Sequence, residues 1–347
     1  MNVLVSALLK KVCRYLVPPS DHWAHFLSIL DRSTLEHNPS LDRSGKQALF
    51  KRNITLVELE PHAFCNRTCS FCPNSTIDRL TVKTVLDRPL YESILNDLKA
   101  IEYDQVLRFA RYSEPMADDH IYDMVAMARR RLPKADIDIV TNGDYLDAET
   151  LNRLREVGLS VLRISVYMRK GVPWSVANAQ EEIGRLAKRI EIEPRWDPPT
   201  TTTVGAVFPY SGMKVVVYSH NFDETGYDRG QLIERLVDHA YVRRSPCFLV
   251  FSNFTVDFNG KVMPCCNLRS DHREHQPFIL GDLSDRRTSI FDVYANRISI
   301  EWRRGLAGAG EKHPPCNTCK QKTLDGPALD KLGKAVDARL HALGLRV

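Results

Sequence analysis

From residue 54 onward, short apolar runs alternate with longer segments in which apolar residues recur at helical spacing. Short runs rich in β-branched residues are typical of buried strands. The pattern predicts strands at residues 54–60, 105–110, 136–140, 160–168 and 213–219, and helices at residues 90–101, 120–131, 148–157, 177–190 and 231–240. Regular alternation of strand and helix predicts an α/β fold with a parallel sheet and right-handed crossovers.

The two ends of the chain depart from this repeat. Residues 1–16 carry apolar side chains at helical spacing, which predicts an amphipathic helix. After Cys247 the pattern changes to short strands and turns, and Asn259-Gly260 between two apolar runs predicts a hairpin. Residues 193–212 fit no predicted element. These changes divide the chain into a helical N-terminal extension (1–53), a core (54–243), a small α+β domain (244–325) and a C-terminal helix (326–347).

Charge and hydropathy narrow the class of protein. The net charge is +5 and is spread along the chain, so nucleic-acid binding is not expected. No apolar stretch approaches the ~20 residues that span a bilayer. Lys10 and Lys11 follow the first apolar run, whereas a secretory signal places its positive charge before the run. We therefore expect a cytoplasmic protein with neither a membrane nor a nucleic-acid partner.

The cysteines are the most informative residues. Of the nine, only Cys13 stands outside two clusters, and without a secretory signal such clustering indicates metal binding rather than disulfides. Cys65, Cys69 and Cys72 stand in the segment CNRTCSFC, directly after the first predicted strand. Three thiolates would hold an iron–sulfur cubane and leave one iron open to a further ligand. The alternative is a zinc site, for which His62 is the only nearby fourth ligand.

This cysteine spacing, with Phe71 before the last cysteine, resembles the radical S-adenosylmethionine (SAM) superfamily. The resemblance implies a partial (β/α)6 TIM-like barrel. It also implies that SAM binds the open iron and is cleaved by one electron to methionine and a 5′-deoxyadenosyl radical. Further elements match the family in order and are expected to contact SAM, namely Tyr112, Ser113 and Glu114 before a proline, Asn142 in a Thr-Asn-Gly turn, and Ser165. Ser113 replaces the usual glycine of the family.

The second cluster comprises Cys247, Cys265, Cys316 and Cys319. Four thiolates would complete a second [4Fe-4S] cubane, although a zinc ribbon suits the same spacing. The order C-x12-G-x4-C, followed by C-x2-C, resembles the twitch domain, a shorter relative of the SPASM domain of radical SAM enzymes. The resemblance implies one auxiliary cluster. Cys266 is left over, either as a small buried residue or as a thiol that donates a hydrogen atom or replaces a ligand.

Polar residues after the last predicted barrel strand are candidates for substrate binding. Loops at this end of a barrel face the active site, so we expect catalytic roles for His220, Asp223, Asp228, Arg229 and also Tyr167. An ordinary solvated loop is the alternative. His272 and His275 are expected at the surface.

The predicted function is hydrogen-atom abstraction from a small natural-product intermediate of the sugar, aminocyclitol or nucleoside type, giving oxidation or epimerisation. The alternative is a maturase that crosslinks or epimerises a ribosomal precursor peptide. Residues 1–53 look too short for the leader-binding domain that such maturases often carry. Either enzyme would need an external one-electron reductant such as flavodoxin or ferredoxin. A non-catalytic iron–sulfur carrier and a zinc-bearing RNA-binding protein are the remaining alternatives.

Overall fold

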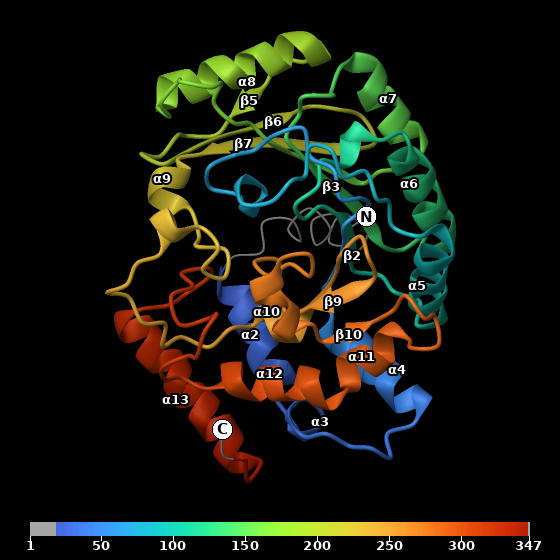
Figure 1. Cartoon of the computed structure of the whole chain (residues 1–347), viewed down its shortest axis with the longest axis vertical. Coiled ribbons are helices and arrows are strands. Elements are labelled where there is room, and N and C mark those ends of the chain that lie inside the picture. The colour runs from blue at the N-terminus through green and yellow to red at the C-terminus, as the bar shows by residue number, and fades with distance from the viewer. Residues whose placement is uncertain (1–18, 346–347) are drawn as a thin grey trace, which may run out of the picture.

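The computed structural model describes residues 19–345, so the amphipathic helix predicted for residues 1–16 lies outside the described residues. Five strands form the predicted parallel sheet, in the order β1 (Leu56–Leu59), β2 (Val106–Phe109), β3 (Asp136–Thr141), β4 (Val161–Ser165) and β7 (Lys214–His220). Between them run α5 (Arg88–Ala100), α6 (His120–Arg131), α7 (Ala148–Glu156) and α8 (Val176–Ile190). These helices lie along the outside of the curved sheet (Figure 1). The predicted α/β, partial TIM-like barrel is confirmed.

Residues 193–212, which the sequence pattern left unassigned, contain two strands. These are β5 (Arg195–Trp196) and β6 (Thr203–Phe208), and β6 pairs antiparallel with β7. The sheet therefore ends at this edge in an antiparallel hairpin rather than in a sixth parallel strand.

The helix predicted at residues 231–240 is wrong, because the structure has only the 3₁₀ turn η4 (Glu234–Leu236) there. Arg229, Gly230 and Gln231 adopt left-handed backbone angles, with φ of 53°, 65° and 72°. A right-handed helix cannot begin on such residues.

The C-terminal part extends the same sheet on its other side. Strand β8 (Asn253–Val256) pairs parallel with β1, and β9 (Lys261–Met263) and β10 (Gly281–Asp282) follow in antiparallel order. Gly260 has φ of 80°, and the predicted hairpin between β8 and β9 is confirmed. Residues 244–325 are more helical than the predicted strands and turns, with α10 (Leu249–Ser252), α11 (Ile290–Ala295) and α12 (Arg297–Ala307). The helix predicted at residues 326–347 corresponds to α13 (Gly326–Ala342).

The N-terminal helices cover this extension. They are α2 (Pro19–Ile29), α3 (Arg32–Leu35) and α4 (Arg43–Asn53), and they gather with α11 and α12 at the lower end of the molecule (Figure 1). Phe26 of α2 packs edge-on against Phe251 of α10, with ring centroids 5.0 Å apart. Residues from the two ends of the chain thus share a second, smaller core.

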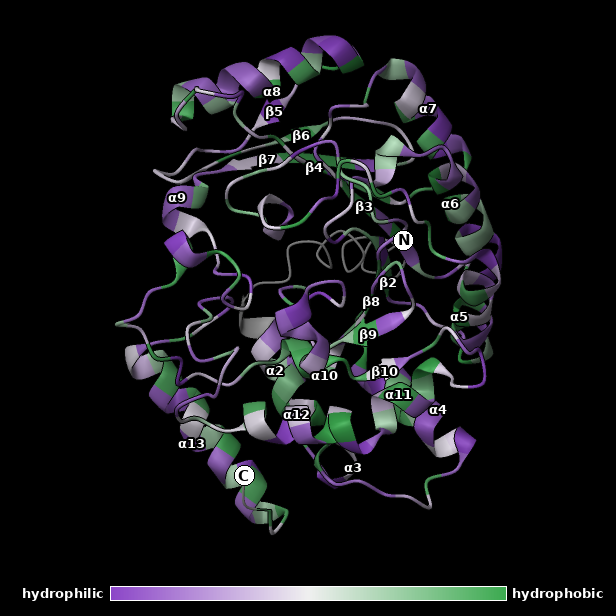
Figure 2. Ribbon diagram, in the orientation of Figure 1, coloured by the Kyte–Doolittle hydropathy of each residue, from purple (hydrophilic) through white to green (hydrophobic). Residues whose placement is uncertain are grey.

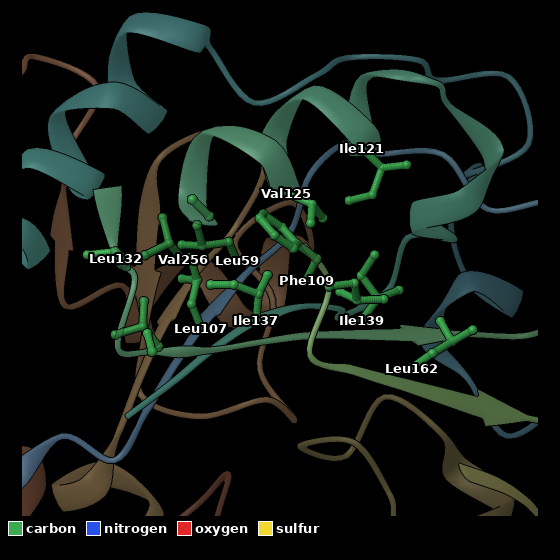
Figure 3. Packing of buried hydrophobic residues seen from close by; sticks show 14 of the residues in the cluster. Leu59, Leu107, Phe109, Ile121, Val125, Leu132, Ile137, Ile139, Leu162 and Val256 are labelled. Carbon is green, nitrogen blue, oxygen red and sulfur yellow. The ribbon is translucent and has the colours of Figure 1, made fainter. Parts of the chain in front are cut away.

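The main core lies between the sheet and its outer helices. Leu107 and Phe109 of β2 and Ile139 of β3 are fully buried beside Ile121 and Val125 of α6 (Figure 3). The helices are apolar toward the sheet and hydrophilic on the outside (Figure 2).

The alternate strand positions point to the concave face of the sheet, where the residues are charged. Arg108 and Arg163 both donate hydrogen bonds to the carboxylate of Asp138, at 2.8 and 2.7 Å. The packing therefore leaves a polar inner face and places the carboxyl ends of the strands around it, where ligands bind in such folds.

Candidate functional site

The first cysteine loop follows β1. The amide of Cys65 donates to the carbonyl of Arg79 at 2.9 Å, and the amide of Cys72 donates to that of Cys69 at 2.9 Å. Cys65, Cys69 and Cys72 are free, half-buried thiols. Burial, together with the charge of neighbouring thiols, raises the pKa of Cys65 to about 11 and that of Cys69 to about 12. Thiols with pKa values this high stay protonated near neutral pH until a bound metal displaces their protons.

Side chains between the cysteines fasten this loop to the end of β3. Arg67 donates to both carboxylate oxygens of Asp144 at 2.6 Å, and Asn66 donates to one of them at 2.7 Å. Asn142, in the Thr-Asn-Gly turn, donates to Asn66 at 2.7 Å. Arg67 had no predicted role, because nothing in the sequence reveals that its side chain reaches Asp144.

Glu114 lies beside the Thr-Asn-Gly turn that contains Asn142, and it is 2% exposed. Its carboxylate accepts hydrogen bonds from Thr141 Oγ1 at 2.5 Å and from the amide of Asn142 at 2.6 Å. Burial raises the pKa of Glu114 to about 7, although these hydrogen bonds oppose the shift. Ser113, next to Glu114, and Ser165, at the end of β4, are also buried. The structure thus brings Glu114, Asn142 and the cysteine loop together, as the sequence predicted.

The element around Glu114 also reaches the second cysteine cluster. Tyr112 Oη donates to the carbonyl of Cys266 at 2.9 Å, and Asn74, two residues after Cys72, donates to the carbonyl of Tyr112 at 2.7 Å. Arg111, with φ of 85°, forms a buried ion pair with Asp257. The left-handed residue here is Arg111, so the serine that replaces the usual glycine at position 113 has no positive φ to accommodate.

A cavity of about 510 Å³ opens beside the first cysteine loop. Its aromatic wall includes Phe71 and Phe222, whose rings stack with centroids 4.0 Å apart, and Tyr167, 5.3 Å from Phe71. His220 lines the cavity and bonds through Nδ1 to Thr203 Oγ1 at 2.9 Å. Asp223 is largely exposed and pairs with Arg235 at 2.7 Å. The cavity can hold a ring-shaped ligand against aromatic faces.

The second cysteine cluster lies among buried cations. Cys247, Cys265, Cys316 and Cys319 are free. Burial, and then mutual repulsion of the thiolates, raises the pKa of Cys265 and of Cys316. Arg243 is 1% exposed and Lys312 is 8% exposed. No sequence motif marks either cation. Four thiols beside two buried positive charges fit an anionic, thiolate-bound cluster.

The segment after β7, the last barrel strand, contacts the second cysteine cluster. Asp228 accepts a hydrogen bond from Thr318 Oγ1 at 2.5 Å, and Gln231 donates to Asn317 at 2.9 Å, so both hold the Cys316–Cys319 loop. Asp228, on the segment after β7, therefore contacts the loop of the second cysteine cluster and does not line the cavity beside the first. Arg229 donates to Asn267 at 3.0 Å, and its Nε is buried without a hydrogen-bond partner in the described residues.

Arg229 is held at the second cysteine cluster by Asn267, whose Nδ2 lies 3.7 Å from Cys319 Sγ. Burial lowers the pKa of Arg229, but the charges of Tyr112, Cys72 and Cys266 oppose this effect and raise the pKa overall. A buried cation with an unused N–H group at this place can bind an oxygen of a ligand.

Two further predicted residues have partners in this region. The Cys266 thiol contacts the side-chain amide of Gln321, whose Nε2 lies 3.5 Å from Sγ. His275 is buried, contrary to the expected surface position, and its Nε2 lies 2.9 Å from the carbonyl of Gly230. It packs under the left-handed segment at residues 229–231, a contact that no sequence motif marks.

Across residues 19–345, no group of three or more His, Cys, Asp or Glu side chains is arranged around one point as for a single metal ion. The ligands of a cubane bind different irons and are spaced more widely. Likewise, no helix in the described part of the chain is long and apolar enough to cross a membrane.

Comparisons with known proteins agree with this site. Residues 59–168 match the radical SAM superfamily, and residues 247–320 match an iron–sulfur cluster-binding domain, SPASM. The S-adenosyl-L-methionine-dependent 2-deoxy-scyllo-inosamine dehydrogenase of Niallia circulans is 23% identical over 272 residues, which are 78% of this chain and 94% of the relative. The crystal structure of BtrN in complex with AdoMet and 2-DOIA has a TM-score of 0.51 at 20% identity, over 73% of this chain and 87% of that one. The chain thus carries a radical SAM domain followed by a SPASM domain.

Proposed function

We propose that this chain is a radical SAM enzyme that removes a hydrogen atom from a small polyhydroxylated ring compound, of the sugar, aminocyclitol or nucleoside type, and thereby oxidises or epimerises it. The observation that carries the proposal is the position of the first cysteine loop. Its Asn66 bonds to Asn142, whose amide donates to Glu114, and Asn74 and Tyr112 connect the end of the loop to the backbone of Cys266. The similarity to a SAM-dependent inosamine dehydrogenase supports a small-molecule substrate.

Cys65, Cys69 and Cys72 would hold the first cluster, and Cys247, Cys265, Cys316 and Cys319 would hold the second. Bound SAM and the first cluster supply a carbon radical strong enough to take hydrogen from an unactivated C–H bond. An external one-electron reductant, such as flavodoxin or ferredoxin, is part of the proposal.

The chain's own residues bind and orient the two ligands. The Glu114 carboxylate suits the ammonium group of SAM, and its position beside Thr141 and Asn142 fixes where that group sits. The aromatic faces of Phe71 and Tyr167 offer contact to a ring and exclude water from it.

Arg229 is the proposed substrate-binding residue. Its unpaired Nε–H is directed neither to solvent nor to a carboxylate of the described residues, so an oxygen of the bound substrate would satisfy it. A hydroxyl or carbonyl oxygen fits this role, whereas a substrate ammonium group would be repelled and must lie elsewhere. His220 and Asp223 lie at the cavity and are proposed to contact the substrate at its outer side.

The test of this function is deuterium transfer. Ring-deuterated 2-deoxy-scyllo-inosamine, a deuterated sugar and a deuterated nucleoside are each incubated anaerobically with enzyme, SAM and dithionite. We expect mass spectrometry to find deuterium in 5′-deoxyadenosine with at least one of these ring compounds. Transfer only from a deuterated precursor peptide would replace the proposal by the maturase function. Absence of any 5′-deoxyadenosine would refute both.

A further inference from the structure

Arg243 is buried against the second cysteine cluster in a way that the proposed catalysis does not use. Its guanidinium donates to the carbonyls of Ser245, Pro246 and Gln321 at 2.7 to 3.1 Å. The same group lies 3.2 Å from the carbonyl of Cys319 and 3.7 Å from its Sγ. Arg243 is therefore fixed in one place, with an N–H group directed at a cysteine sulfur.

No carboxylate among the described residues forms an ion pair with Arg243 or with Lys312, whose ammonium donates to the carbonyl of Gly308 at 2.6 Å. A buried charge is strongly unfavourable unless an opposite charge compensates it. The ionisable group that Arg243 contacts is Cys319, whose Sγ lies 3.7 Å from Nη1. Cluster-bound thiolates would therefore supply the compensating charge.

The cation of the first cysteine loop has different surroundings. Arg67, which stands between Cys65 and Cys69, is neutralised by both carboxylate oxygens of Asp144. Arg243 has no such carboxylate partner among the described residues, so its charge can act on the second cluster.

We propose that Arg243 sets the reduction potential of the second cluster, by holding against Cys319 an N–H donor and a positive charge that no carboxylate of the described residues neutralises. The potential of an iron–sulfur cluster depends on net charge, hydrogen bonds to sulfur and exposure to solvent. One-electron reduction adds one negative charge to the cluster, and a buried cation stabilises the reduced form more than the oxidised form. Arg243 therefore raises the potential. Asn267, whose Nδ2 lies 3.7 Å from Cys319 Sγ, acts in the same direction.

This inference rests on the proposed second cluster, so iron is counted before any potential is measured. The full chain carrying Cys65→Ala/Cys69→Ala/Cys72→Ala isolates the second cluster, and about four irons per chain show that it is loaded. In this background Arg243→Met is compared with Arg244→Met. Arg244 is the matched control, because it is the next residue and its side chain is 64% exposed in an ion pair with Glu311. The measurement is an anaerobic dithionite titration followed by electron paramagnetic resonance.

We expect Arg243→Met to shift the midpoint potential to a more negative value, Arg243→Lys to restore most of the shift, and Arg244→Met to leave the potential unchanged. A loaded Arg243→Met variant with the potential of Arg244→Met would overturn the proposal. If Arg243→Met binds less iron, Lys312→Met decides the question, because it removes a buried cation without touching the contact to Cys319. An unchanged potential in loaded Lys312→Met would then overturn the electrostatic explanation. If the triple cysteine variant that retains Arg243 binds no iron, the proposed second site itself is refuted.

Discussion

Replacing Cys65, Cys69 and Cys72 by alanine is expected to remove about half of the iron and all SAM cleavage. These thiols are the only cysteines in the loop that is fastened to Glu114 and Asn142, the proposed SAM-binding residues. The second cysteine cluster has its own set of side chains and should keep its iron. Iron analysis and detection of 5′-deoxyadenosine by chromatography measure the two effects.

Thr76→Ala is the control for this triple variant, because Thr76 is exposed and lies just past the same loop. It should keep full iron and full cleavage. SAM cleavage by the triple variant at the wild-type rate would show that SAM is activated elsewhere.

The variant Cys316→Ala/Cys319→Ala is expected to lose the second cluster and much of the stability of the C-terminal part. The Cys316–Cys319 loop is held by Asp228 and by Gln231, and it surrounds the buried Arg243. Without the cluster and two of its four thiolates, that cation loses much of its compensating charge, and loss of a buried partner charge costs up to about 3–5 kcal/mol. Metal binding at such a site also contributes directly to folding. Iron content and thermal unfolding followed by circular dichroism measure the loss.

Cys266→Ala provides the comparison for this double variant. The Cys266 thiol contacts the side chain of Gln321. We therefore expect this single variant to keep about eight irons. Full iron in Cys316→Ala/Cys319→Ala, with wild-type unfolding, would contradict the assignment of the second site.

The strands and helices of the barrel were predictable because each buries one face against its neighbours. Leu107 and Phe109 point to the helices, while Arg108 between them points to the concave face, and this alternation is visible in the chain itself. The hairpin at Asn259-Gly260 was equally visible, since a turn of this kind requires local backbone freedom and little else.

The wrong or missing secondary-structure predictions fall in segments where tertiary contacts outweigh the local preference of the chain for helix or loop. Residues 231–240 carry helix-forming side chains, but the segment before them is held in left-handed conformations by Thr318, Asn317 and His275. Strand β6 was missed because its neighbouring loop is rich in threonine and proline, and its pairing with β7 is set by the sheet edge.

Residues of the candidate site were predictable only where they stand in a sequence motif. The cysteines and Glu114 stand in recognisable spacings. Arg243 and Arg244, in contrast, are adjacent and chemically identical in the sequence, yet one is buried against Cys319 and the other is exposed. Such a difference depends on which side of the segment meets the second cysteine cluster, and no local pattern encodes it.

The most direct test of the two-cluster account is the metal content of the wild-type protein after anaerobic purification and reconstitution. The cysteines of both clusters are free thiols, three in the first and four in the second, so we expect two cubanes with about eight irons per chain and no stoichiometric zinc. Stoichiometric zinc with no iron would contradict the account, because neither SAM cleavage nor the proposed role of Arg243 could then stand.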